Sequence, residues 1–277
     1  MTATVPLGVA EQTEIATYVS FATGAPQAVR EAMGIASGRF GAGLALTVGQ
    51  EPSCFFNRAG GFSSSSDVTL ETLREVRDFY REQGVRQGAM MIAPAILPKD
   101  WGSITGALNL REGSRFTKLG CAIETALPAS DGVAKLDPRL RVGLVEPHQA
   151  REWASVMMPT FGFAPGMVDV AASLVHRPDW RNYAVWENER IVAAGSVFLN
   201  GDSADMFGGA TVPEARGRGA QSALLTARAR AAEAAGCRWL VAEAVAEGPT
   251  DHNTSLHNML RAGFEPLYDR VTWSWRP

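Results

Sequence analysis

Residues 207–235 read FGGATVPEARGRGAQSALLTARARAAEAA, a stretch that joins a short apolar run to a glycine-rich turn and a long alanine-rich run. Phe207 to Val212 is apolar and β-prone, which predicts a buried strand. Pro213 ends this strand, because proline has no N–H to donate to a neighbouring strand. Strong helix formers dominate from Ser222 onward, so the stretch predicts a strand, a turn and a helix in succession.

The turn in this stretch, Arg216 to Gln221, has the features of an anion-binding site. The first four N–H groups of a helix have no partner within it, and the helix dipole adds partial positive charge beside them. Gly217 and Gly219 let the backbone approach a phosphate closely, and Arg216 and Arg218 add full charge. The pattern predicts a pyrophosphate-binding loop, with a solvated basic helix start as the alternative.

Two common phosphate-binding motifs do not fit this turn. The dinucleotide fingerprint needs Gly-x-Gly-x-x-Gly or Ala, whereas the run that starts at Gly217 ends on Ser222. A Walker loop needs Gly-Lys-Ser or Gly-Lys-Thr at its end, and the turn has neither. The bound pyrophosphate is therefore expected to belong to another cofactor.

The turn resembles the cofactor-binding segment of the GNAT acyltransferase superfamily, whose pattern is Arg/Gln-x-x-Gly-x-Gly/Ala after a strand and a Pro-acid approach. Arg216 to Gln221 matches except at its last position, where Gln221 stands for a small residue, and Val212 to Ala215 resembles the usual approach. A second match follows at Asn253 to Phe264, which resembles the family's Asn-x-x-Ala/Ser helix ending in Gly-Phe. Together the matches cover about Arg141 to the C-terminus.

The resemblance implies that acetyl-CoA is the co-substrate and that the fold is α/β (α+β). It further implies a strand whose backbone N–H groups polarise the thioester carbonyl, at Gly209 to Thr211. The cofactor-binding residues that it implies are Gly209, Ala210, Thr211, Arg216, Gly217, Arg218, Gly219, Ala220, Gln221, Asn253, Ser255 and Asn258.

The length of 277 residues suits two domains. In the first half the predicted elements are helices at 7–19, 26–36, 70–83 and 101–110 and strands at 43–49, 54–61, 89–93 and 114–125. Ser37 to Gly43 mimics the glycine-rich turn but precedes a strand, so we interpret it as a loop. The order of elements echoes the second half and resembles a degenerate copy of the same fold.

We therefore expect two tandem GNAT-like domains, 1–130 and 139–277, each a mixed, mostly antiparallel sheet flanked by helices. The linker is predicted at Ala126 to Pro138, where prolines, glycines and small polar residues gather.

The composition limits the kinds of binding partner and cellular location that can be expected. A formal net charge of −3 gives no sign of a nucleic-acid partner, and no stretch is apolar enough to cross a bilayer. Three scattered cysteines form no metal motif, so no metal is expected, and nothing requires an oxidising compartment. The N-terminus has no signal-peptide pattern, so the expected location is cytoplasmic, and nothing in the pattern indicates an oligomeric state.

The resemblance implies direct attack of an amine on the thioester, with a general base and an acid. Glu243 is the candidate base, because burial among apolar residues would raise its pKa; a solvent-facing glutamate is the alternative. Many family members place a tyrosine acid where this chain has Met259. Tyr268 is the first substitute and His257 another, and a structural role is the alternative for both.

The resemblance implies that three aromatic residues contact the acceptor. They are Trp153, Phe161 and Phe163, and packing in the core is the alternative for each. The expected function is an acetyl-CoA-dependent N-acyltransferase that acts on a small-molecule or peptide amine. A coenzyme-A-binding module without turnover is the second hypothesis, and a purely structural tandem partner is the third.

Overall fold

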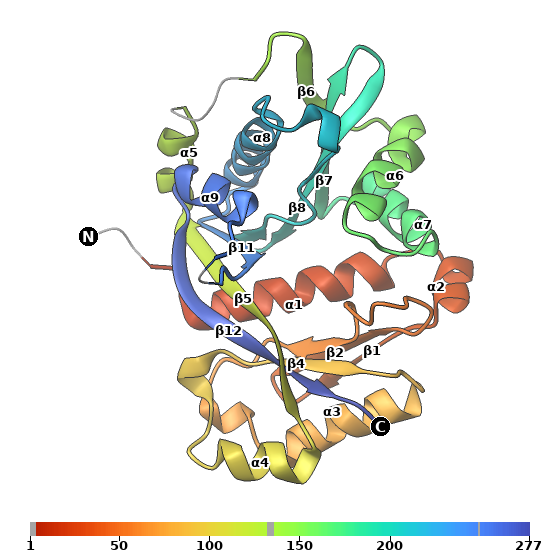
Figure 1. Ribbon diagram of the computed structural model, residues 1–277, viewed down its shortest axis with the longest axis vertical. Coiled ribbons are helices and arrows are strands. Elements are labelled where there is room, and N and C mark those ends of the chain that lie inside the picture. The colour runs from red at the N-terminus through yellow and green to blue at the C-terminus, as the bar shows by residue number, and fades with distance from the viewer. Residues whose placement is uncertain (1–3, 132–135, 249) are drawn as a thin grey trace.

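The computed structural model describes residues 4–131, 136–248 and 250–277, and its strands form one continuous sheet (Figure 1). From one edge to the other the order is β1 (Ile35–Phe40), β2 (Gly43–Val48), β3 (Arg58–Gly60), β4 (Gly88–Met91), β12 (Glu265–Trp275), β5 (Arg111–Ala122), β11 (Trp239–Val245), β9 (Ser203–Asp205), β8 (Arg190–Asn200), β7 (Trp180–Glu187) and β6 (Leu140–Leu144). Strand β10 (Ala210–Thr211) pairs with β8. Most neighbours are antiparallel, and β3 with β4 and β9 with β11 are parallel.

Helices cover the sheet in both halves. They are α1 (Leu7–Thr23), α2 (Gln27–Met33), α3 (Leu70–Glu82), α4 (Trp101–Leu108), α5 (Ile123–Asp131), α6 (Ala150–Thr160), α7 (Gly166–Ala172), α8 (Ala220–Ala234) and α9 (Thr254–Arg261). The structure therefore confirms the predicted α/β class with a mixed, mostly antiparallel sheet. None of the helices in the described ranges is long and apolar enough to cross a membrane.

The two halves of the sequence interleave at the centre of the sheet. Strand β5, from the first half, lies between β11 and β12 of the second half. Strand β12 in turn lies between β4 and β5, so each of these strands has both neighbours in the opposite half. The halves thus share backbone hydrogen bonds, and the predicted limits of 1–130 and 139–277 stay a prediction.

Helix α1 crosses the middle of the molecule between the two halves (Figure 1). It packs against β2 and β3 of the first half and against β8, β9 and β11 of the second. Its buried face carries Ile15 and Phe21, as an ordinary core helix would, but also Glu11 and Glu14. Buried carboxylates are rare unless they are paired, so this face marks a polar centre within the fold.

Three sequence predictions need correction. The segment 37–43 was expected to be a loop, but Ile35–Phe40 is β1 and pairs with β2 through a tight turn in which Gly41 has φ +58°. The first part of the predicted linker is helix α5, while residues 132–135 lie outside the described residues. The strand predicted from Phe207 to Val212 is reduced to Ala210–Thr211, because ladder pairing stops at the end of β9, which lies between β8 and β11, and resumes with β8 only at Ala210.

Candidate functional site

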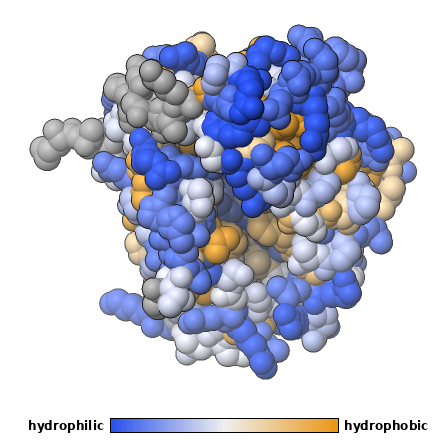
Figure 2. Space-filling view, turned by 45° about the horizontal axis from the view of Figure 1, so that its top comes forward, coloured by the Kyte–Doolittle hydropathy of each residue, from blue (hydrophilic) through white to orange (hydrophobic). Residues whose placement is uncertain are grey.

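A cavity of about 1190 Å³ opens between the two halves. Figure 2 shows it as a hollow near the centre of one face, with hydrophobic residues in its depth. Its walls come from the loop before β3, from β5, from the loop before α7, from the break between β9 and β10, and from β11, α9 and β12. Segments that carry both predicted motifs therefore meet segments from the first half around one space.

Both predicted cofactor motifs contribute residues to the lining of the cavity, although Arg216 to Ala220 and Asn258 are not among them. Gly209, Gln221, Asn253 and Ser255 line the cavity together with Met259. Gln221 joins the motifs, because its Nε2 donates to Ser255 Oγ at 2.9 Å and its Oε1 accepts a hydrogen bond from the Asn258 side chain. The glutamine that departs from the family pattern thus connects α8 to α9.

The start of α8 offers unpaired backbone donors. Gly217 and Gly219 have φ of +74° and +81°, a left-handed conformation that glycine adopts without strain. No side chain caps the helix. Within the described residues the N–H groups from Arg218 to Gln221 have no hydrogen-bond acceptor. This geometry can bind an anion.

The two arginines of the turn differ. Arg216 is exposed, and its Nε lies 3.3 Å from the Thr211 carbonyl oxygen. Arg218 instead pairs with Asp137 at 2.9 Å and Glu187 at 2.7 Å, so its charge is already balanced on the side of β7. An anion at this turn would therefore meet the Arg216 side chain and only the backbone of Arg218.

The remaining predicted cofactor residues have structural partners. Ala210 and Thr211 lie on β10 and pair with β8, outside the cavity lining. Ala220 begins α8 and is buried. The Asn253 side chain caps α9 by accepting from the N–H groups of Ser255 at 3.0 Å and Leu256 at 3.2 Å. The cap fixes the start of α9 beside the cavity.

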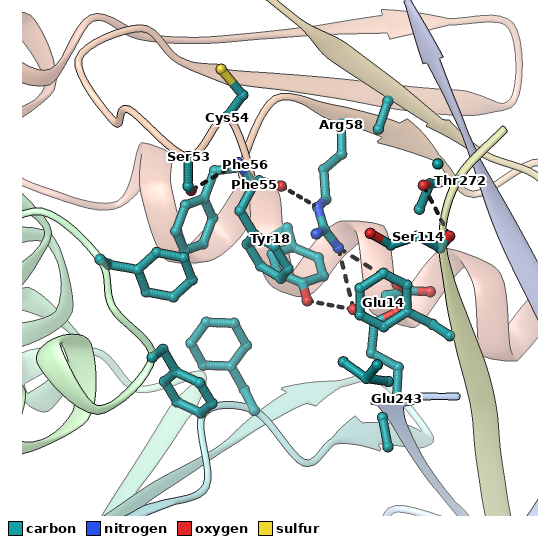
Figure 3. Close-up of a pocket in the computed structure, with 18 of the residues that line it drawn as sticks. Glu14, Tyr18, Ser53, Cys54, Phe55, Phe56, Arg58, Ser114, Glu243 and Thr272 are labelled. Atoms are coloured by element: carbon teal, nitrogen blue, oxygen red, sulfur yellow. Dashed lines mark hydrogen bonds and ion pairs between the residues drawn. The ribbon is translucent and has the colours of Figure 1, made fainter. Parts of the chain in front are cut away.

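Glu243, the candidate base, lies on β11 at the wall of the cavity (Figure 3). Its Oε1 accepts from the Tyr18 hydroxyl at 2.7 Å and from Arg58 Nη1 at 3.3 Å, and its Oε2 accepts from Arg270 Nη2 at 3.1 Å. Burial and the nearby Glu14 carboxylate raise the pKa of Glu243, against the attraction of Arg58. A raised pKa was also the expectation from the sequence, but the groups around Glu243 are ionic rather than apolar.

A buried network continues from Glu243 behind the cavity. Arg270 binds Glu11 through two contacts of 2.7 and 2.8 Å and Glu14 through two of 2.6 and 2.8 Å. Lys118 also contacts Glu14. Burial alone would raise the pKa of Glu14, but Arg270 and Lys118 outweigh it and hold this pKa well below its usual value.

Tyr268, the candidate acid, belongs to this network and does not line the cavity. Its hydroxyl donates to Glu11 Oε1 at 2.6 Å, and burial together with the charge of Glu11 raises its pKa. His257, the other substitute, pairs with Glu247 at 3.0 Å on the outer side of α9. Met259 lines the cavity, whereas Tyr268 and His257 are both absent from its lining.

Part of the cavity wall is aromatic. This aromatic wall consists of Tyr18, Phe55, Phe56, Phe161, Phe163 and Phe207. Phe163 packs against Phe55 and Phe56, with ring centroids 5.3 and 4.8 Å apart. Trp153, by contrast, is fully buried and donates its indole N–H to the Tyr183 carbonyl at 2.9 Å, so it belongs to the core.

Sequence reasoning missed several charged residues of the site. Arg58 lies between the rings of Tyr18 and Phe55, 4.0 Å from each centroid. Asp205 is buried. Its burial and the charges of Glu14 and Glu243 raise its pKa to about 8, although the charge of Lys118 acts in the opposite direction. Arg228 is buried on the inner face of α8. Its spacing of four residues from Leu224 was a signal, because positions i and i+4 share a helix face.

Glu247, His252 and His257 could together hold a metal ion. Their ligand atoms lie within 4.8 Å of one another, and the two imidazole rings stack with centroids 4.5 Å apart. None of the three lines the cavity. A metal ion at this surface cluster would therefore lie outside the space in which the predicted reaction would take place.

Comparison with known proteins identifies the fold. No protein-family model matches the sequence. No curated protein matches it either. Among solved structures, a GCN5-related N-acetyltransferase from Sphaerobacter thermophilus is 13% identical with a TM-score of 0.61, covering 100% of this chain and 95% of its own. One from Kribbella flavida is 14% identical with a TM-score of 0.60, over 90% and 93% of the two chains.

A tandem GNAT protein from the clavulanic acid biosynthesis pathway is 15% identical with a TM-score of 0.56, over 74% of this chain and 69% of that one. At these identities the likeness concerns the fold.

Proposed function

The chain has the fold of the GNAT superfamily, in the two-domain form that the tandem protein shares, and on this basis we propose that it transfers an acetyl group from acetyl-CoA to an amine. The observation that carries the proposal is one cavity whose lining combines residues of both cofactor motifs with Glu243 and the aromatic wall. A donor held by the α8 turn and an acceptor held by the aromatic rings would meet in one space.

The proposed reaction is a direct transfer. The amine nitrogen attacks the thioester carbonyl carbon, the carbon–sulfur bond breaks, and its electron pair leaves with the sulfur as a thiolate. The proton that the amine loses goes to Glu243, whose raised pKa favours accepting it. The hydrogen bonds from Tyr18, Arg58 and Arg270 hold this carboxylate at the cavity wall.

The aromatic wall suggests what the acceptor carries besides its amine. Six aromatic side chains form this wall, and apolar surface binds most favourably where it displaces water from apolar surface. The proposed acceptor is therefore an amine with an apolar or aromatic body, in preference to an amino sugar.

The donor site can be tested with a pair of variants at the two ends of α8. Gly219 and Gly236 both have φ +81°, so aspartate would have to adopt the left-handed region at either position. Only G219D also places a negative charge beside the proposed phosphate site. We expect G219D to weaken the binding of coenzyme A at least tenfold in calorimetric titration and G236D to leave it near the wild-type value. Equal affinities would refute the placement.

Turnover can be tested by thiol release from acetyl-CoA in the presence of aromatic, aliphatic and sugar amines. We expect E243Q to bind coenzyme A normally and to lose about 10²–10⁴-fold in turnover, the usual contribution of a general base. E214Q is the matched control, because Glu214 is exposed and lies outside the cavity lining. Full activity in E243Q would exclude Glu243 as the base.

A coenzyme-A-binding module without turnover is the second candidate function. It is favoured by Met259, which lines the cavity where many GNAT enzymes place a tyrosine acid and which cannot donate a proton. Binding of coenzyme A without thiol release for any amine would support this candidate. Absence of binding by the wild type would contradict both.

A further inference from the structure

Arg228 is a buried cation with no role in the acyl transfer proposed above. It lies on the inner face of α8, with the residue only 1% exposed. Gly195 on β8 makes room for it, since a Cβ atom at that position would come within 3.3 Å of the guanidinium carbon. The sheet is thus shaped to accept this side chain.

The hydrogen bonds of Arg228 go to neutral groups. Its Nε donates to the Leu224 carbonyl at 3.0 Å, and its Nη1 donates to the carbonyls of Ser196 at 3.2 Å and Phe207 at 3.3 Å. Within the described ranges no carboxylate forms an ion pair with it, and its Nη2 has no hydrogen-bond partner.

The charge of Arg228 is therefore largely uncompensated. Burial, partly offset by Asp205, lowers its pKa to about 10, so it remains a cation at neutral pH. Asp205, with its own pKa raised to about 8, is mostly protonated there and adds little negative charge. A buried cation without a counter-ion is unfavourable, which points to an anionic ligand as its missing partner.

The Arg228 guanidinium lies beside the expected thioester position. Arg228 lines the cavity together with Gly208 and Gly209. A Cβ atom at Gly209 would lie 3.5 Å from Nη2, so this nitrogen is next to the backbone that the family resemblance assigns to the thioester. Met259 lines the same cavity and supplies no proton.

We propose that Arg228 Nη2 donates a hydrogen bond to the sulfur of the donor and stabilises the thiolate that leaves. This inference rests on the proposed acyl transfer. As the new carbon–nitrogen bond forms and the carbon–sulfur bond breaks, the electron pair moves to the sulfur. The amine proton moves to Glu243, and Arg228 keeps all of its protons. A fixed cation would thus replace the proton that a tyrosine supplies.

The test is the thiol pKa of coenzyme A bound to the protein, read from the ultraviolet absorbance of the thiolate during a pH titration. Desulfo-coenzyme A bound to the same protein gives the baseline and removes the contribution of the three cysteines. A cation within about 4–6 Å lowers an acid's pKa by about one to three units. We expect the bound thiol to titrate that far below free coenzyme A in the wild type.

The variants identify the residue responsible. R228M should return the thiol pKa to the value in free solution or above it, R228K should retain part of the shift, and the exposed control R190M should retain all of it. In turnover, R228M should lose about 10²–10³-fold in kcat, comparable to removal of one oxyanion donor.

The outcomes separate the two proposals. Coenzyme A that binds the wild type with an unshifted thiol pKa would overturn the role of Arg228 and leave the acyl transfer standing. A wild type that does not bind coenzyme A would overturn both. If R228M does not fold, the thiol pKa shift in the wild type and its reduction in R228K still decide whether Arg228 stabilises the thiolate.

Discussion

Replacing Arg270 with methionine tests how the buried ion network holds the two halves together. Arg270 is 1% exposed and lies within 3.1 Å of Glu11, Glu14 and Glu243, so its loss leaves three carboxylates with only Lys118 and Arg58. Removing one partner of a buried ion pair costs about 3–5 kcal/mol. With an unfolding entropy of about 2.1 cal/mol/K per residue over 277 residues, this corresponds to a fall of about 5–9 °C in Tm.

The assay is urea unfolding and differential scanning calorimetry of R270M beside R190M, since Arg190 forms an exposed pair with Glu214 that contributes at most about 1 kcal/mol. The pH dependence is a second check. The depressed pKa of Glu14 contributes stability above about pH 4, which is lost as the pH falls, whereas carboxylates freed of Arg270 become easier to protonate. The gap between R270M and wild type should therefore narrow from pH 7 to pH 4. We would reject this account if R270M lost no more stability than R190M, or if the stability difference between R270M and wild type did not change with pH.

Three further results are expected. Because the Asp205 pKa is raised to about 8, folding takes up a proton between about pH 5 and 8, and wild-type stability falls with rising pH by up to about 1.4 kcal/mol per unit from this group. D205N should lack this slope in urea unfolding at pH 6 and 8, and parallel slopes would contradict the burial argument. N253A should lose about 1 kcal/mol through the missing cap of α9, and N253D should recover most of it; equal losses would exclude capping. F163A should raise the KM for an aromatic amine while F40A, outside the cavity, should not, and unchanged KM values would place the acceptor elsewhere.

The elements that were predicted correctly are those with a strong local pattern. Helix α3 alternates charged and apolar positions at helical spacing, and α8 follows a glycine turn with strong helix formers. Strand β1 was missed because the extended form of this polar, glycine-containing segment comes from pairing with β2 rather than from its own residues. The interleaving of β5 and β12 could not be predicted, since strand neighbours so distant in sequence leave no local signal.

The candidate site likewise contains residues that short sequence motifs predict and residues that only the fold brings together. The turn before α8 and the start of α9 follow short motifs, and the structure brings them together through Gln221. Arg58 lies far from either motif in the sequence, and only the meeting of the two halves brings it to Glu243. Asp205 comes directly before the first motif stretch, but only the parallel pairing of β9 with β11 places it beside the strand that carries Glu243. Met259 was recognised by its motif position, but the buried cation Arg228 in the lining of the same cavity required a structure.

The shared middle of the sheet has a consequence for synthesis on the ribosome. Strand β12 is made after every other strand that the structure describes, yet it fills the place between β4 and β5 of the first half. The nascent first half therefore cannot complete its sheet while it emerges, and it presents open strand edges until β12 has been synthesised. Until then its buried carboxylates on α1 also lack Arg270. The sheet of the first half is thus completed late, when β12 takes its place between β4 and β5.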